Sequence, residues 1–483
     1  MYKKLLFFIL VPVIAIGQVQ IGVDIDGEAP NDQFGSGVAI SSNGSVIAVG
    51  AVFNDGNGVD SGRVQVFKNI LGVWTQIGSN IDGDAAGDQC GTVALSSDGT
   101  IIAVGSLGSD NGSDVEAGHV RVFENTSGVW TQIGSKIVGE GYGDNSGVGL
   151  ALSWDGTIVA IGAPHNNNGG GVAAGHVRVF ENISGVWTQI GNDIDGKSTA
   201  EYSGHSLSLS SDGSIVAIGA RGNDPGHVRI YQNISGIWTQ IGNEIQGEAV
   251  GDESGVAVSL SSNGNIVAIG ARGNNGNGLL SGHVRIYQNI SGIWTQIGND
   301  IDGEAEGDWS GSKVSLSSDG TTVAIGSPWN NDNGKVAGHV RIFKNMSGVW
   351  RQVGNSIDGK AAGDWAANAV LSSDGNTVII GATLNSDNGQ YSGKVRVYDI
   401  SNLSSNTFVL ENFNIYPNPT SDVLNISLEN NLTLEKITIY NNSGQIVKTA
   451  QQNTVDVSNL SSGIYFVEVI TNQGIATKKV VVK

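Results

Sequence analysis

Short runs of alternating hydrophobic and polar residues recur along the first 400 residues of the chain. In the stretch that follows Gly255, residues 256–261 alternate, residues 266–271 form an apolar run rich in β-branched side chains, residues 283–287 alternate again, and residues 293–298 end the unit. Alternation with a period of two predicts half-buried strands, and an uninterrupted apolar run predicts a strand that is covered on both faces. We therefore predict four antiparallel strands in this unit and no helix.

The same unit returns along the chain with a regular period. A Trp in the sequence VWTQIG, IWTQIG or VWRQVG recurs at intervals of 51 to 57 residues, at Trp74, Trp130, Trp187, Trp238, Trp294 and Trp350. Seven copies are counted from the Gly of the Ser-Ser-Asp/Asn-Gly or Ser-Trp-Asp-Gly turn, at Gly44, Gly99, Gly156, Gly213, Gly264, Gly320 and Gly375. Seven repeats of four antiparallel strands predict an all-β fold, a seven-bladed β-propeller of four-stranded blades over residues 18–400.

The two ends of the repeat region complete each other. The seventh copy stops after Ile400 without a WTQIG strand, whereas residues 18–22, Gln-Val-Gln-Ile-Gly, have no strands before them. We expect residues 18–22 to supply the fourth strand of the last blade and so to remove an exposed sheet edge. Residues 1–17, with Lys3 and Lys4 before an apolar run, are expected to be a signal peptide that is removed on export.

Composition and charge narrow the partners. The chain has 72 Gly residues and 14% charged residues, which excludes a coiled-coil or long-helix protein. With 45 acidic and 25 basic side chains, the net charge of −20 disfavours nucleic acid and anionic membranes. Cys90 is the single cysteine, so no disulfide forms within the chain. We expect an exported protein that acts as a monomer.

Side chains that recur once per copy are interpreted as structural. The six WTQIG tryptophans bury large apolar surfaces. Five histidines occupy one equivalent position, whereas a catalytic histidine is normally unique, so they are interpreted as packing or hydrogen-bonding residues: His119, His176, His227, His283 and His339. Arg63 and Lys394 replace histidine in the first and last copies. The six arginines two residues further on are interpreted as links between blades.

The copies resemble the FG-GAP repeat of integrin alpha chains and bacterial surface proteins. Phe34-Gly35-Ser-Gly-Val38, the IAVGA sequence over 47–51 and Ile161-Gly-Ala-Pro164 carry the resemblance. This resemblance implies a propeller that binds a ligand. The calcium loop of the family, Asp-x-Asp-x-Asp-Gly, is replaced here by a bare Ser-Ser-Asp-Gly turn, so calcium is not expected at that turn.

The C-terminal segment has a different pattern. Residues 401–412 are predicted to be a linker, and residues 413–483 a small β-sandwich of Ig-like form. The segment resembles the type A C-terminal sorting domain of the type IX secretion system. The resemblance rests on Tyr416, Pro417, Asn418 and Pro419, on Gly444, on Gly463 and Tyr465, and on Lys479 and Lys483. It implies export to the outer cell surface through the type IX machinery, and removal of the domain by a sortase-like peptidase.

The long connections, after the second and fourth strands, are expected on one face of the ring. They are rich in Asp, Asn and Gly, and many of the Asp residues lie in recurring IDG or GD sequences, at Asp26, Asp82, Asp302, Asp308, Asp358 and Asp364, among others. We interpret them first as turn formers. Calcium is the alternative, because carboxylates and amides are its usual ligands, and no other cofactor is expected.

Three tryptophans depart from the repeat. Trp309, Trp329 and Trp365 lie in long connections of the sixth and seventh copies, with Asp308 and Asp364 directly before two of them. Aromatic side chains beside carboxylates suit the stacking of sugars or a protein partner. We predict a ligand-binding patch there, in a non-catalytic adhesion or recognition protein for an extracellular carbohydrate or protein. The alternative interpretations are tryptophans that cap the blades, and a glycoside hydrolase or lyase that uses loop carboxylates.

Overall fold

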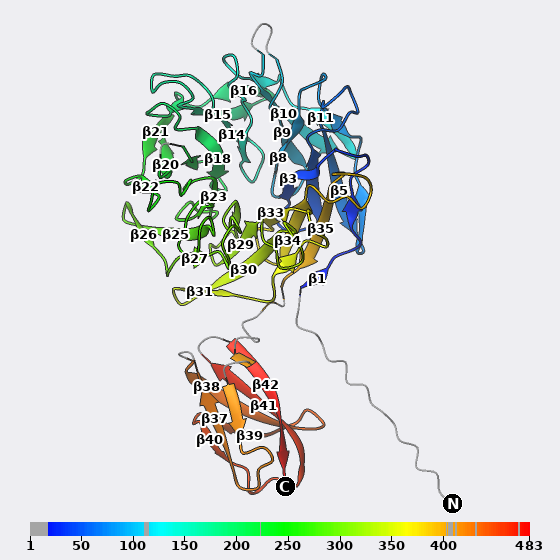
Figure 1. Ribbon diagram of the computed structural model, residues 1–483, viewed down its shortest axis with the longest axis vertical. Helices are drawn as coiled ribbons and strands as arrows, with labels where there is room; N and C mark the ends of the chain where they lie inside the picture. The colour runs from blue at the N-terminus through cyan, green and yellow to red at the C-terminus, as the bar shows by residue number, and fades with distance from the viewer. Residues whose placement is uncertain are drawn as a thin grey trace, which may run out of the picture. The chain divides into compact units, whose positions relative to one another are not determined.

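The computed structural model describes residues 18–110, 115–222, 224–401, 403, 409–410, 413–429, 432–471 and 474–483 (Figure 1). The predicted signal peptide lies outside these residues. The named elements, β1 to β42, are all strands. In the described part of the chain no helix has the length and apolar character needed to span a membrane. One compact unit covers Val19–Ser401 and a second contains Asn402–Lys483.

The larger unit contains seven five-stranded antiparallel sheets, numbered here in chain order. Sheet 1 consists of β3 (Phe34–Ile40), β4 (Val46–Ala51), β5 (Arg63–Ile70), β6 (Val73–Gln76) and β7 (Ile81–Asp82). Sheet 2 consists of β8 (Cys90–Leu95), β9 (Ile101–Ser106), β10 (His119–Thr126), β11 (Val129–Gln132) and β12 (Ile137–Val138). Sheet 3 consists of β13 (Gly149–Leu152), β14 (Ile158–Ala163), β15 (His176–Ile183), β16 (Val186–Gln189) and β17 (Ile194–Asp195). Sheet 4 consists of β18 (Ser203–Leu209), β19 (Ile215–Ala220), β20 (His227–Ile234), β21 (Ile237–Gln240) and β22 (Ile245–Gln246).

The three remaining sheets follow the same order. Sheet 5 consists of β23 (Ala257–Leu260), β24 (Ile266–Ala271), β25 (His283–Ile290), β26 (Ile293–Gln296) and β27 (Ile301–Asp302). Sheet 6 consists of β28 (Lys313–Leu316), β29 (Thr322–Ser327), β30 (His339–Met346), β31 (Val349–Gln352) and β32 (Ile357–Asp358). Sheet 7 consists of β33 (Ala366–Leu371), β34 (Thr377–Ala382) and β35 (Lys394–Asp399), together with β1 (Val19–Gln20) and β2 (Ile25–Asp26) from the start of the chain.

The outermost strand of each sheet differs from the predicted single fourth strand. In sheet 5, β26 pairs with residues 287–290 of β25, and β27 pairs with His283 and Val284 at the other end of the same strand. Gly298, between the two short strands, has a φ of 73°, a left-handed conformation that ends the first pairing. The outer edge of the sheet is therefore two short strands joined by a turn, which gives five strands where the sequence pattern predicts four.

In sheet 7 the outer position is filled from the beginning of the chain. Val19 pairs with Asp399, Ile25 pairs with Val395, and the amide of Ile21 donates to the carbonyl of Val397 at 2.8 Å. The indole Nε1 of Trp74, in sheet 1, donates to the carbonyl of Ile21 at 2.8 Å. The first residues described thus join the last sheet to the first.

The sheets lie around a common centre, with their first strands innermost (Figure 1). These first strands contact one another in the order β3, β8, β13, β18, β23, β28 and β33, and β33 also contacts β3. Sheets 1 and 7 share a hydrophobic core that includes Val38, Ile47, Ile379 and Val395. Apolar side chains on both faces of the second strands fill the spaces between neighbouring sheets, as the uninterrupted IVAIGA runs predict.

The second unit has two antiparallel sheets. One contains β36 (Phe413–Tyr416), β37 (Val423–Leu428) and β40 (Thr454–Asp456), and the other contains β38 (Leu434–Asn441), β39 (Ile446–Ala450), β41 (Gly463–Thr471) and β42 (Gly474–Val482). Residues of both sheets, such as Leu424 and Val467, form one core. Val409, within the segment expected to be a linker, is also buried in this core.

Candidate functional site

The three tryptophans outside the repeat lie against one another. The rings of Trp309 and Trp329 are stacked, with centroids 4.7 Å apart and planes 19° apart, and the centroid of Trp365 lies 6.1 Å from that of Trp329. Trp309 lies between β27 and β28, Trp329 between β29 and β30, and Trp365 between β32 and β33. Trp329 is 38% exposed and Trp365 is 36% exposed. The structure thus brings the three predicted residues into one aromatic cluster, called the Trp cluster below.

Trp309 and Trp365 occupy a backbone position that recurs in every sheet. The residue after the Asp or Glu of this loop has a φ between 51° and 56° in all seven sheets: Gln33, Gln89, Asn145, Tyr202, Glu253, Trp309 and Trp365. A left-handed conformation costs roughly 1–2 kcal/mol for a residue other than Gly. The backbone is therefore fixed by the fold whereas the side chain varies from sheet to sheet, as expected at a recognition position.

Asp308 and Asp364 do not belong to the exposed surface of this cluster. The carboxylate of Asp308 is buried and accepts hydrogen bonds from the amide of Ala305 at 2.9 Å and the side chain of Asn330 at 3.3 Å. The Asp364 carboxylate likewise accepts from the amide of Lys360 at 2.8 Å and from the side chain of Asn385 at 3.0 Å. We assign both to the loops, which they shape by capping backbone amides, and not to ligand contact.

The Trp cluster borders a cavity of about 240 Å³ at one mouth of the central channel. The channel has a volume of about 440 Å³ and is lined by the first strands of all seven sheets. Five residues line both spaces: Ser36, His205, Val256, Lys313 and Asn368. A ligand that stacks on the tryptophans therefore also reaches polar and cationic side chains inside the channel mouth.

A chain of side-chain contacts extends from the Trp cluster around this mouth. The guanidinium of Arg272 lies over the ring of Trp309 at 4.8 Å, and its Nη2 lies 2.8 Å from Glu253. Glu253 also lies 3.5 Å from Arg221, which stands over the ring of Tyr202 at 5.5 Å. Tyr202 contacts His165 edge to face at 5.5 Å. Two arginines joined by Glu253 thus connect the Trp cluster to Tyr202 and His165 along the loops of sheets 3 to 6.

Two basic side chains at the channel mouth have pKa values below their usual range. The Lys313 side chain is exposed to the channel, yet desolvation by the strands that line the channel lowers the pKa of its ammonium, and the charge of Arg272 lowers it further. Burial also lowers the pKa of His205 to about 3, with Arg221 and Lys313 contributing, so its imidazole is neutral at pH 7. An anionic ligand group would relieve the repulsion between Lys313 and Arg272.

Sequence reasoning misses Lys313 and Arg272. A signal for Lys313 exists in the alignment of the copies, because the residue paired with the Gly of the second strand is uncharged in the six other sheets: Gly37, Thr92, Gly149, Ser206, Ala257 and Asn368. Lys313 pairs with Gly326 at the same position. A single cation on the wall of the channel is thus visible in the sequence once the copies are aligned.

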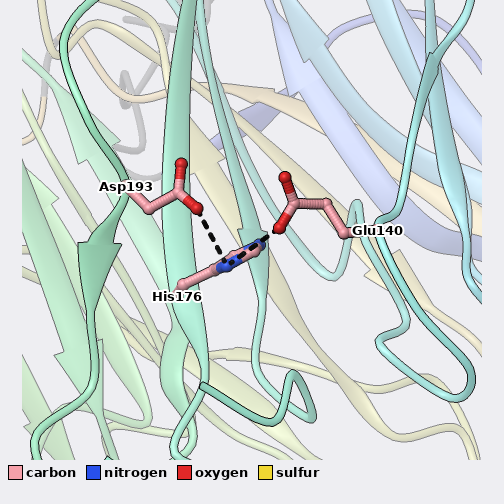
Figure 2. Close-up of side chains that lie close together, drawn as sticks. All are labelled: Glu140, His176 and Asp193. Carbon is pink, nitrogen blue, oxygen red and sulfur yellow. Dashed lines mark ion pairs between the residues drawn. The ribbon is translucent and has the colours of Figure 1, made fainter. Parts of the chain in front are cut away.

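A second group of side chains lies further out, at the start of each third strand. In sheet 3 the buried His176 lies between two carboxylates, with its Nδ1 at 3.7 Å from Asp193 and 3.9 Å from Glu140 (Figure 2). Similar clusters of histidine and carboxylate occur in sheets 5 and 6. These nitrogen-to-oxygen separations are longer than those of a hydrogen bond. The carboxylate oxygens and the imidazole nitrogen are suitable ligands for a metal ion.

Among the sorting residues, the Tyr-Pro-Asn-Pro sequence contacts the last strand of the second unit. The side chain of Asn418, in the Tyr-Pro-Asn-Pro sequence, donates to the carbonyl of Lys479 at 3.0 Å and accepts from the amide of Val481 at 3.0 Å. Tyr416, Pro417, Pro419 and Lys479 are exposed, and so is the C-terminal Lys483. Gly444 is in a turn with a φ of 77°, and the Tyr465 hydroxyl donates to the carbonyl of Ser461. The Tyr-Pro-Asn-Pro sequence and the last strand therefore form one surface.

These features define an all-β protein with propeller-like repeats. Residues 414–483 match the secretion system C-terminal sorting domain, and residues 18–67 match the FG-GAP repeat. Both sequence resemblances are thereby confirmed. The sorting domain shows that the protein is exported and is either secreted or attached to the outer cell surface.

Several solved structures are similar at low identity. They include a putative 6-phosphogluconolactonase of Bacteroides uniformis, at 13% identity over 69% of this chain and 88% of that chain, with a TM-score of 0.49. A protein of Lactobacillus plantarum has 12% identity over 90% and 99% of the two chains, with a TM-score of 0.48. The periplasmic gluconolactonase of Pseudomonas aeruginosa has 15% identity over 87% and 95%, with a TM-score of 0.46. No curated protein matches the sequence. These values do not transfer an activity to this chain.

Proposed function

We propose that residues 18–401 form a closed seven-bladed β-propeller that recognises an acidic carbohydrate outside the cell, and that the sorting domain, an Ig-like sandwich, delivers it there. Closure is supported by the contact of β33 with β3 and by the pairing of β1 with the last sheet. On export the sorting domain engages the type IX machinery and is removed by a sortase-like peptidase. The propeller is a monomer that is secreted or held on the surface.

The observation that carries the recognition function is the Trp cluster at the channel mouth beside Lys313 and Arg272. Stacked, partly exposed indoles bind the apolar faces of sugar rings, and each aromatic contact contributes about 1 kcal/mol beyond the buried area. The chain has a net charge of −20, yet these two cations lie in the lining of this one cavity. Carboxylate or sulfate groups on a glycan would complement them.

The cavity lining favours binding over hydrolysis. Glycosidases use a pair of carboxyl groups that flank the scissile bond. Among the described residues that line the cavity, none is Asp or Glu, and the nearby Glu253 is held by Arg221 and Arg272. Asp308 and Asp364 are buried in their loops. The calcium alternative is not supported at Asp308 and Asp364, because backbone amides and asparagines occupy these two carboxylates.

The test is binding of polygalacturonate, chondroitin sulfate and neutral dextran to the exported protein, measured by calorimetry. We expect the two acidic polymers to bind, and Trp329→Ala to weaken them by about tenfold, which corresponds to the loss of one aromatic contact. Lys313→Met should weaken the acidic polymers while leaving any affinity for dextran unchanged. Raising the salt concentration should weaken the same contacts.

Trp154→Ala is the matched control. Trp154 is 41% exposed, but it lies in the tight turn before β14, at the end of its sheet opposite the long connections. The variant should bind like the unmodified protein. Binding of acidic polymers that is insensitive to both Trp329→Ala and Lys313→Met would contradict the proposed site, and binding of dextran alone would contradict the acidic ligand.

A further inference from the structure

The histidine of sheet 6 lies in a cluster with unsatisfied polar atoms. The side chain of His339 is fully buried, and its Nδ1 has no hydrogen-bond partner within the described residues. Nδ1 lies 3.7 Å from a carboxylate oxygen of Glu304, 3.7 Å from one of Asp332 and 3.9 Å from one of Asp358. The Asp358 oxygen is likewise buried without a hydrogen-bond partner in that part of the chain. Three carboxylates thus surround a nitrogen that none of them reaches.

The charges in this group are not balanced. One imidazole faces the carboxylates of Glu304, Asp332 and Asp358, and the neighbouring cation Arg341 lies 3.9 Å from a carboxylate oxygen of Glu304. The group as arranged therefore has excess negative charge.

Sheet 7 shows what the same position holds when the sequence supplies a cation. Lys394 replaces histidine, and its ammonium lies 2.9 Å from Asp24 and 3.2 Å from Asp26 and contacts Asp387. Asp387 and Asp332 occupy equivalent loop positions, as do Asp26 and Asp358, which pair with the first residue of their third strands. In sheet 1, Arg63 takes the same place, with Nε 2.6 Å from Asp82.

We propose that the cluster of Glu304, Asp332 and His339, with Asp358 beside it, binds a divalent transition-metal ion, for which Zn²⁺ is the first candidate. The ion takes the place that the charged side chains of Lys394 and Arg63 occupy in their sheets. Two ligands about 2.1 Å from one Zn²⁺ lie roughly 3.4 Å apart at the tetrahedral angle, so the observed separations need only small side-chain movements. The mixture of imidazole and carboxylate selects zinc over calcium, which prefers oxygen ligands alone.

The position of the ligands gives this site a consequence for the Trp cluster. Glu304 is in the same loop as Trp309, Asp332 is in the loop of Trp329, and Asp358 lies on β32, directly before the loop of Trp365. One bound ion would therefore tie together the three connections that carry the tryptophans. The site rests on its own geometry and does not depend on the carbohydrate function.

The experiment compares the unmodified protein with His339→Lys, which copies the arrangement of sheet 7. After EDTA treatment and dialysis, Zn²⁺ binding is measured by calorimetry, and the thermal midpoint and tryptophan emission are recorded with and without Zn²⁺. We expect His339→Lys to bind one equivalent fewer than the unmodified protein. Zn²⁺ should raise the thermal midpoint and change the tryptophan emission of the unmodified protein, and His339→Lys should lose the emission change.

His339→Lys is expected to fold, because its ammonium balances the carboxylates without metal, and a thermal midpoint in EDTA at or above that of the unmodified protein would show this. Asp332→Asn is a second variant that should lose the same equivalent. Glu306→Gln, at an exposed residue of the loop that holds Glu304, should bind Zn²⁺ like the unmodified protein. An equal number of bound ions in the unmodified protein and in both site variants would overturn the proposal, as would a zinc affinity weaker than about 10 μM in the unmodified protein, roughly −7 kcal/mol.

Discussion

Each recurring tryptophan links its sheet to the preceding one by a hydrogen bond as well as by packing. The indole Nε1 donates to a backbone carbonyl between the two short outer strands of the preceding sheet in all six cases, at 2.8–3.0 Å, from Trp74, Trp130, Trp187, Trp238, Trp294 and Trp350. Repetition predicts a structural residue at this place. It does not reveal the partner, since the acceptor lies about 50 residues earlier in the chain.

Trp238→Phe isolates this hydrogen bond. Phenylalanine keeps most of the apolar contact, but it leaves the carbonyl of Ile190 without the indole donor, which lies at 2.8 Å. We expect the free energy of unfolding to fall by about 1 kcal/mol, seen as a lower midpoint in urea. Trp154→Phe is the control, since the Trp154 side chain is exposed, and it should leave the midpoint unchanged. Equal midpoints for Trp238→Phe and the unmodified protein would contradict the role of the bond.

The functional residues show where a sequence pattern fails at this scale. Trp309, Trp329 and Trp365 stand out because the other copies do not repeat them, and the structure gathers them into one cluster. Adjacency in sequence groups Asp308 with them, yet consecutive residues in a loop can face opposite environments. The left-handed backbone at Trp309 separates the indole from the buried carboxylate of Asp308. Adjacency along the chain is therefore a poor guide to a site built from loops.

At the scale of the element, periodicity predicts the strands and their boundaries well where both faces are buried. The run over 266–271 is β24 as the sequence indicates, because a short apolar run rich in β-branched residues suits a strand that is covered on both faces. The outer strands are less predictable. Their exposed side chains constrain the register weakly, and the split into β26 and β27 depends on the conformation of Gly298.

Deletion of residues 18–26 tests the contribution of β1 and β2. The deletion exposes the edge of β35 and removes Asp24 and Asp26 from Lys394, which is 4% exposed and would keep only Asp387. The deletion removes the backbone pairing of β35 and two of the three carboxylate partners of Lys394, so the urea midpoint should fall clearly. Deletion of Gln18 alone is the control and should have little effect. If the longer deletion also left the midpoint unchanged, these strands would not contribute to closing the last sheet.

At the scale of the whole molecule, the positions of the titratable groups determine how stability depends on pH. Five of the seven sheets place histidine at the start of the third strand, within 4 Å of a carboxylate in each case. Burial lowers the pKa of His119, His176, His283 and His339. Below about pH 6.5 these histidines take up a proton in the unfolded chain, whereas they stay neutral in the folded protein. The stability of the fold therefore depends on pH.

His119 allows this dependence to be measured apart from the proposed metal site. Burial, with the charges of Lys136 and Arg121 contributing against the opposing charge of Asp84, lowers its pKa from 6.5 to about 4. Between these values the unfolded chain binds a proton that the folded chain does not bind, so stability falls as the pH falls from about 6.5 towards 4. At pH 5 the loss from this one residue is about 2 kcal/mol.

His119→Gln can keep a hydrogen bond to Ser109, which now lies 2.7 Å from the imidazole, and cannot take up a proton. Urea unfolding in EDTA at pH 7.5, 6 and 5 should therefore show a smaller decrease for His119→Gln than for the unmodified protein. Parallel decreases in the two proteins would show that His119 is protonated equally in the folded and unfolded states.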